Sequence, residues 1–306
     1  MGNNYHEPVM IEEVKSFFGL DKAHLNNQVQ KYIDATLGTA GYTVSLCKPG
    51  VQVLGVEADE KMLEISKKRL LETCPASDKS VGSYKLAHAN FKDLLKIAAE
   101  NGFTNVDGIV FDLGVSNLQL TSEKRGFSFS NKDVQLDMRM DESGQAVKAG
   151  DLLNALSEKE LVELFEETLS LNIARILAKR VVEKRKEKVF ETVGDFLGVV
   201  ERVIRKKGKL HPATKPFLAL RIATNSELDN LKSVLPDAFS LLKKGGKLIV
   251  VSFHSGEDGL VKEYFRNTED KGFAKVLTHK PLKPTAEEIY KNSKARSAKM
   301  RVLQKI

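Results

Sequence analysis

YIDATLGTAGYT, the sequence of residues Tyr32–Thr43, passes from an apolar, β-favouring segment through an acidic residue into small residues and then into a helical pattern. Gly38 and Gly41 leave the main chain bare at the turn, so that a nucleotide-like ligand could approach the backbone closely. An ordinary tight turn between a strand and a helix would use the same residues. The stretch therefore predicts a strand–turn–helix unit, and it leaves the purpose of the glycines open.

Apolar runs alternate with amphipathic segments on both sides of this unit. Further strands are expected in residues 51–59 (VQVLGVEAD), 84–91 (YKLAHANF) and 106–114 (VDGIVFDLG), with helices between them. The pattern resumes with a helix over residues 227–246 and the strand KLIVVSFHS of residues 247–255. Short apolar strands separated by helices imply right-handed βαβ crossovers and a parallel sheet. The predicted class is α/β, with a Rossmann-like sheet.

The periodicity changes between these two halves. Helical patterns without a convincing strand fill residues 121–216, for example DLLNALSEKELVELFEET from Asp151. We therefore predict a discontinuous sheet domain, residues 1–120 and 217–306, interrupted by a helical insertion, residues 121–216. The tail after Lys280 is rich in proline, lysine and serine, and we expect it to lie over the surface.

Bulk composition narrows the class of protein. The chain has 306 residues, of which 42% are hydrophobic and 29% charged, so a packed core is expected. A net charge of +7 favours a polyanionic partner. Cys47 and Cys74 show no metal-ligand spacing, and we expect neither a disulfide nor a zinc site. Without a long apolar run or a signal peptide, the prediction is a cytoplasmic protein that does not enter membranes.

Three acidic residues end predicted strands. Asp34 ends the first strand, Glu57 the second and Asp112 the fourth, and ligands bind at the carboxyl ends of parallel strands. Glu57 could hold both hydroxyls of a ribose, or it could be a solvated residue at a strand end. Asp112 could face the same crevice or only cap a turn. Because neither GxGxxG nor GxxxxGK[ST] is present, an adenosine ligand without a diphosphate is favoured, of which S-adenosylmethionine (SAM) is the common one.

Eight blocks of sequence, taken together, resemble the bacterial 16S rRNA cytosine-N4 methyltransferase family known as RsmH or MraW. They are HEPVM (6–10), DATLGTAGYT (34–43), FDLGVSNLQL (111–120), RGFSF (125–129), LDMRMD (136–141), HPATKPFLALRIATN (211–225), VSFHSGED (251–258) and ARSAKMR (295–301). The resemblance spans almost the whole chain. It implies a SAM-binding sheet domain interrupted by a helical domain for the RNA substrate, and a protein that acts on 16S rRNA or the small ribosomal subunit.

The resemblance also implies site residues. In addition to Gly38, the expected cofactor contacts are Ala40, Gly41, Tyr42, Glu57, Phe91, Asp112 and Gln119. This chain departs from the family at Ala40 and Tyr42, where Gly-Gly-His is usual across 40–42, and at Glu57, where aspartate is usual. These departures leave open a second possibility, a SAM-binding RNA or ribosome-assembly factor with weakened catalysis. A third possibility is an amino-methyltransferase acting on another nucleic acid.

The implied reaction methylates the exocyclic N4 of a cytidine, a poor nucleophile because its lone pair is delocalised into the ring. An acceptor that is hydrogen-bonded to this amino group would stabilise its developing positive charge. The candidates are Asp112, Ser116, Asn117 and Asp137. Candidate substrate-binding residues are Arg125, Arg139, His211, His254 and Arg296. No metal ligand set is apparent, and we expect a monomer or homodimer without an obligatory protein partner.

The helical insertion carries a run of basic residues. ARILAKRVVEKRKEK, from Ala174, and IRKKGK, from Ile204, contain eleven lysines and arginines. They could contact RNA phosphates, or they could form a solvated helix face.

Overall fold

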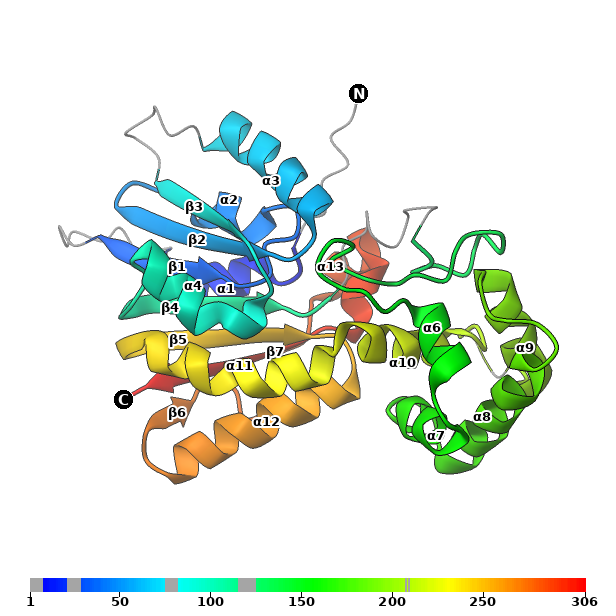
Figure 1. The fold of residues 1–306 in the computed structure, drawn as a ribbon. Coiled ribbons are helices and arrows are strands. Elements are labelled where there is room, and N and C mark those ends of the chain that lie inside the picture. The colour runs from blue at the N-terminus through cyan, green and yellow to red at the C-terminus, as the bar shows by residue number, and fades with distance from the viewer. Residues whose placement is uncertain (1–7, 21–28, 75–81, 115–124, 207, 209) are drawn as a thin grey trace. The chain divides into compact units, whose positions relative to one another are not determined.

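The computed structural model describes residues 8–20, 29–74, 82–114, 125–206, 208 and 210–306. Contacts within the chain divide it into two compact units. The first unit comprises residues 1–114 and 229–306, and the second comprises residues 115–228. Figure 1 shows the strands of the first unit and the helices of the second.

The first unit is built on a sheet of seven described strands in the order β3-β2-β1-β4-β5-β7-β6. The strands β1 to β5 pair in parallel, whereas β7 lies antiparallel between β5 and β6. This arrangement confirms the predicted Rossmann-like class. The strands are β1 (Gln30–Asp34), β2 (Val51–Glu57), β3 (Ser83–His88), β4 (Val106–Asp112), β5 (Leu242–Ser252), β6 (Ala274–Val276) and β7 (Lys299–Lys305).

Strand β7 corrects the expectation that the tail lies over the surface. Met300, Val302 and Leu303 are buried, and β7 pairs with β5 along six residues. The lysines and the arginine of this segment made it look like an exposed segment in the sequence, which is why the strand was not predicted. Lys299 and Arg301, however, pair with Asp258 at 2.9 and 2.6 Å, so their charges are neutralised within the fold.

Helices cover both faces of the sheet, as the alternation along the strands requires. Ile33 and Ile109 pack with α4 and α11 on one face, whereas Tyr32 and Val110 pack with α1 and α2 on the other. The helical elements here are α1 (Ile11–Phe18), α2 (Gly41–Leu46), α3 (Glu60–Thr73), η1 (Phe91–Asp93), α4 (Leu94–Asn101), α11 (Glu227–Leu241), α12 (Ser255–Asp270), α13 (Ala286–Lys291) and η2 (Ser293–Ser297). None of the described helices combines the length and apolar character needed to cross a membrane.

The second unit contains α6 (Ala149–Ala155), α7 (Glu158–Glu166), α8 (Leu171–Arg185), α9 (Val193–Val203) and α10 (Thr214–Asn225). Its described residues form no strand beyond a single bridge between Gln135 and Thr192. In its core Phe165 stacks on Phe196, and Phe217 packs against Phe196 at a tilt. Because α10 buries Phe217 and Leu220 there, this unit continues past the limit predicted at residue 216.

The two cysteines contradict the expectation from their spacing. Cys47 follows α2, Cys74 follows α3, and the two form a disulfide with their Cα atoms 6.3 Å apart. The prediction of unpaired cysteines was wrong because sequence spacing does not show that α2 and α3 end beside each other.

Candidate active site

The loop after β1 is held from several sides. Glu57, at the end of β2, accepts a hydrogen bond from the Gly38 amide at 2.7 Å. Two side chains of α3 bind the loop carbonyls, because Ser66 Oγ donates to Gly38 O at 2.6 Å and Arg69 Nη1 donates to Thr39 O at 2.9 Å. The short residues between Asp34 and Gly41 therefore form a fixed turn at the carboxyl edge of the sheet.

The two departures in this loop have distinct structural consequences. Ala40 has a left-handed backbone with φ of 62°, which costs an alanine about 1 kcal/mol more than a glycine. Tyr42 uses its hydroxyl, which donates to the carbonyl of Val9 at 2.5 Å. Histidine, the usual residue at this position, lacks a hydroxyl that could make this bond. The tyrosine therefore adds a hydrogen bond that holds the N-terminal segment.

Gly41 also makes room for the N-terminal segment, in addition to the donor contact that the sequence predicts. A Cβ added to Gly41 would lie 2.5 Å from Pro8 Cδ, which is far too close. The missing side chain thus allows the N-terminal segment to pack on the loop. The amide of Met10, two residues further on, donates to Glu288 of α13 at 2.6 Å. Segments from both ends of the chain therefore brace the loop.

Asp34 and Asp112 end the neighbouring strands β1 and β4. Asp34 Oδ2 accepts from the Thr43 hydroxyl at 2.8 Å and the Thr43 amide at 3.2 Å. The Oδ1 atoms of Asp34 and Asp112 are buried and have no hydrogen-bond partner among the described residues. Unsatisfied buried carboxylate oxygens are costly, and a cationic donor would remove that cost.

The surroundings of these acids favour their protonated forms. Burial raises the pKa of Asp34 to about 6, although hydrogen bonds from Thr43 oppose the shift. Burial, followed by the charges of Asp34 and Glu257, raises the pKa of Asp112 to about 8. Clusters of carboxyl groups with shifted pKa values are typical of functional sites.

Glu57 is the last residue of β2, and Phe91 follows shortly after β3. The Oε1 and Oε2 atoms of Glu57 accept from the amides of Asp59 at 2.8 Å and Gly38 at 2.7 Å, and burial raises the pKa of Glu57 to about 7. Each carboxylate oxygen has a second lone pair, which can accept from a ribose hydroxyl. Phe91 begins η1, and its ring meets Phe111 edge-on at 5.7 Å. The contact with Phe111 holds the Phe91 ring in place on one side. Because the residue is only partly buried, the rest of the ring can contact a ligand.

These residues fit SAM. The two unpartnered oxygens suit its ammonium group and the positive charge of its sulfonium, whereas Glu57 suits its ribose and Phe91 its adenine. Sequence reasoning placed Asp34 at this edge but did not propose it as a contact. The signal that could have identified it is its position, the last residue of the strand before the loop.

Ser116, Asn117 and Gln119 lie outside the described residues. Their suggested roles as acceptors or cofactor contacts stay predictions.

Asp137, Arg139 and Arg125 form a network inside the second unit. Arg139 Nε and Nη2 donate to the two carboxylate oxygens of Asp137 at 2.7 and 2.8 Å. Burial opposes ionisation of Asp137, but the hydrogen bonds from Arg139 outweigh it and lower its pKa. Arg125 is 5% exposed, and it donates to Met140 O and pairs with Glu142. The structure therefore gives all three residues a task within the fold.

The remaining candidates lie on different elements of the chain. His211 accepts from the Ala213 amide and stacks on Phe129, with ring centres 4.6 Å apart. His254 is the N-cap of α12, and its Nε2 lies 3.0 Å from Glu257 Oε1. Arg296 is exposed in η2.

The basic run of residues 174–188, which covers most of α8 and the residues just after it, contains cations with and without an ion-pair partner. Arg180, Lys184 and Lys188 each pair with an acidic side chain at 2.7 Å, and Arg185 donates to carbonyls at the end of α6. Arg175, Lys179 and Lys186 have no ion pair with any described residue.

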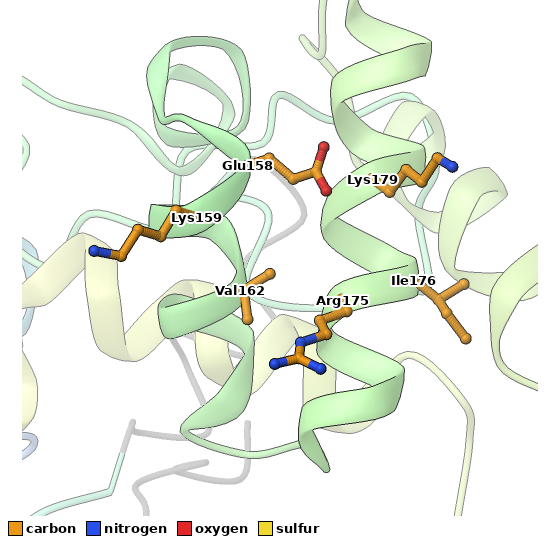
Figure 2. A pocket seen from close by; sticks show the side chains of 6 residues that line it. All are labelled: Glu158, Lys159, Val162, Arg175, Ile176 and Lys179. Atoms are coloured by element: carbon orange, nitrogen blue, oxygen red, sulfur yellow. The ribbon is translucent and has the colours of Figure 1, made fainter.

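Arg175 and Lys179 are one turn apart and line a hollow of 610 Å³ between α7 and α8. Figure 2 shows Arg175 lying between the two helices. The lining residues are Glu158, Lys159, Val162, Arg175, Ile176 and Lys179. Within residues 174–188, the cations without an ion pair to a described residue are therefore those at this hollow and Lys186.

A Rossmann-like sheet with five parallel strands, this loop and these strand-end acids defines a SAM-dependent methyltransferase. The chain belongs to the MraW methylase family, whose model matches residues 3–306. It is 38% identical over 302 residues to the ribosomal RNA small subunit methyltransferase H of Coprothermobacter proteolyticus, covering 98% of this chain and 96% of that protein. The protein of the same name from a Hydrogenobaculum species is 40% identical, with 97% and 94% covered. A solved rRNA methylase from Streptococcus thermophilus aligns with a TM-score of 0.45 at 12% identity, covering 97% of this chain and 96% of that one.

Proposed function

We propose that this protein transfers the methyl group of SAM to N4 of a cytidine in 16S rRNA of the small ribosomal subunit. The observation that carries this proposal is family membership over residues 3–306, together with 37–40% identity to proteins named ribosomal RNA small subunit methyltransferase H. The strand-end acids supply an independent physical reason for a cationic adenosine ligand. The strand-end acids thus support SAM as the donor, and the family membership supports ribosomal RNA as the substrate.

The chain's own residues hold and orient the donor. SAM supplies an electrophilic methyl group on its sulfonium. Asp34 and Asp112 accept from the ammonium end, Glu57 accepts from the ribose, and Phe91 contacts the adenine. The remaining proposed contacts are Gly38, Ala40, Gly41 and Tyr42 of the loop, and Gln119. The braced loop fixes these groups before binding, which lowers the ordering cost on association.

The target amine needs alignment and an acceptor. Holding N4 in line with the methyl group at near-attack distance removes much of the entropic barrier. Asp112, the last residue of β4, or Ser116 or Asn117, which come after it in the sequence, would accept from the amino group and stabilise its developing charge. Asp137 is the weakest candidate, because both of its oxygens already accept from Arg139. After transfer the nitrogen proton is acidic enough to leave to water, so the scheme requires no histidine base.

RNA binding is assigned to the helical unit, in which Arg175 and Lys179 form no ion pair with any described residue and line one hollow. A base must be unpaired or flipped out to be methylated. Arg125 and Arg139 would support this unit from within, whereas His211, His254 and Arg296 stay candidates for direct RNA contact. We propose a cytoplasmic monomer or homodimer that needs no obligatory protein partner.

A second function is favoured by one observation, the strained Ala40 in the donor loop. It is a ribosome-assembly factor that binds SAM but transfers methyl groups poorly. Incubation of the full-length protein with unmethylated small subunits and labelled SAM separates the two. Labelled N4-methylcytidine in digested rRNA, formed over many turnovers, supports the enzyme. Tight SAM and subunit binding with no labelled nucleoside supports the assembly factor.

A further inference from the structure

The disulfide joins two helices that both start at the proposed donor site. Helix α2 begins with Gly41 of the loop, and α3 begins shortly after Glu57. Cys47 and Cys74 follow the opposite ends of these helices, and their Cα separation of 6.3 Å lies within the range that disulfides span. They are also the only two cysteines of the chain. Any thiol chemistry of this protein therefore takes place at this pair.

One face of α3 connects the bridge to the loop. Leu63, Ser66, Leu70 and Cys74 are buried at helical spacing on that face. Ser66 of this face donates to Gly38 O, and Leu63, Leu70 and Cys74 share a small core with Leu37 and Ala40 of the loop. Movement of the end of α3 relative to α2 would therefore reach the loop through a continuous packed row.

We propose that Cys47 and Cys74 form a reversible thiol–disulfide site whose closed form tightens donor binding. This inference rests on the proposed function, because it concerns the same SAM site. The closed bridge fixes α2 against α3 and so reduces the freedom that the loop loses when it binds the donor. Closing the bridge across 27 residues of sequence also restricts the unfolded chain and stabilises the folded one.

The oxidant is a low-molecular-weight disulfide such as oxidised glutathione. The Cys47 thiolate attacks it, forms a mixed disulfide and releases one thiol. The Cys74 thiolate then attacks the Cys47 sulfur, forms the protein disulfide and releases the second thiol. The two protons lost by the cysteines go to the two released thiols. Cys47 reacts first because it is half-buried, whereas Cys74 is 0% exposed.

The test uses the full-length protein, reduced and desalted, with one portion then treated with oxidised glutathione. Alkylation of free thiols and non-reducing digestion, followed by mass spectrometry, show whether the Cys47 and Cys74 peptides are joined. Calorimetry then measures the Kd of S-adenosylhomocysteine for both portions. We expect a joined peptide only after oxidation, and a Kd about threefold to tenfold lower in the bridged form. The matched control, Cys47→Ser with Cys74→Ala, should bind like the reduced protein with or without the oxidant.

Each other outcome contradicts a defined statement. If S-adenosylhomocysteine binds but no joined peptide forms, the thiol–disulfide site does not exist. A joined peptide with an equal or higher Kd overturns the link to donor binding. If neither the wild-type forms nor the double variant bind S-adenosylhomocysteine, the proposed function itself fails and the inference falls with it.

Discussion

Asp34 and Asp112 end adjacent parallel strands, and each keeps one buried carboxylate oxygen without a hydrogen-bond partner among the described residues. Their mutual repulsion contributes to the raised pKa of Asp112. Near neutral pH the raised pKa favours a protonated Asp112 in the donor-free protein, and a cationic ligand would favour the loss of that proton. This relationship connects the fold to the chemistry of the donor.

Donor binding should release protons at neutral pH. The pKa values of Asp34 and Asp112 are raised to about 6 and 8 in the donor-free protein, and a cation bound beside them lowers these values. A ribose hydroxyl that donates to the Glu57 carboxylate likewise favours its ionised form, whose pKa is raised to about 7 without the donor. Calorimetry of SAM binding at pH 7, in two buffers of different ionisation enthalpy, measures the released protons. Asp112→Asn is the matched variant and should release fewer. Identical heats in both buffers for the wild type would contradict the assignment.

The same acids set the pH dependence of stability. Because their folded-state pKa values lie above the unfolded ones, the folded state binds more protons between about pH 4 and pH 8. The free energy of unfolding of the donor-free protein should therefore fall as the pH rises through this window. Saturating SAM should remove most of that decline. Urea titrations at several pH values check this, and a donor-free stability that rises with pH over this window would refute it.

Gly41→Ala should weaken both the fold and donor binding. The new methyl group would meet Pro8, and overpacking of this kind costs about 1–3 kcal/mol. The matched control is Gly259→Ala in α12, where an added Cβ meets nothing within 4 Å and should stabilise the helix by about 0.5–1 kcal/mol. Thermal unfolding and the Kd of S-adenosylhomocysteine are the measurements. Unchanged stability and affinity in Gly41→Ala would show that Pro8 does not pack there.

Replacing Asp137 should lower the stability of the fold, and any loss of methyl transfer should follow from that lower stability. Asp137→Asn leaves Arg139 without its buried partner, and loss of such a partner costs about 3–5 kcal/mol when burial is complete. The expected loss is smaller, about 2–3 kcal/mol, because both side chains keep some exposure. Glu183→Gln, in the exposed pair with Arg180, is the control and should change Tm little. An Asp137→Asn protein of normal Tm that transfers no methyl groups would instead make Asp137 the acceptor.

The hollow between α7 and α8 predicts a specific salt dependence. Arg175→Glu with Lys179→Glu should weaken binding of small-subunit rRNA fragments and reduce the slope of log affinity against log salt by about 1.5. Lys96→Glu with Lys232→Glu makes the same charge change on exposed residues of the sheet unit. Fluorescence anisotropy at several salt concentrations compares the two. Equal slopes of log affinity against log salt in both double variants would show that the hollow is not part of the RNA-binding surface of the protein.

The sequence predicted the parallel strands because their apolar runs and intervening helices have clear periodicities. Strand β7 was not predicted, because its lysines and arginine are typical of an exposed segment. In the structure β7 is a buried strand that pairs with β5, and Arg301 forms an ion pair within the fold. The strand-end positions of Glu57 and Asp112 could be predicted, because in parallel strands these ends share one edge. The pairing of Cys47 with Cys74 and the packing of Pro8 on Gly41 could not, since both depend on contacts between elements that no local pattern records.

Mass spectrometry of rRNA nucleosides tests the central claim most directly. Small subunits from cells without this protein are incubated with SAM and the purified chain, wild type or Asp112→Ala, under single-turnover conditions. The account predicts one N4-methylcytidine per subunit with the wild type, and a large loss of rate with Asp112→Ala. A methyl group found on another atom or on no nucleoside, despite bound SAM, would contradict it.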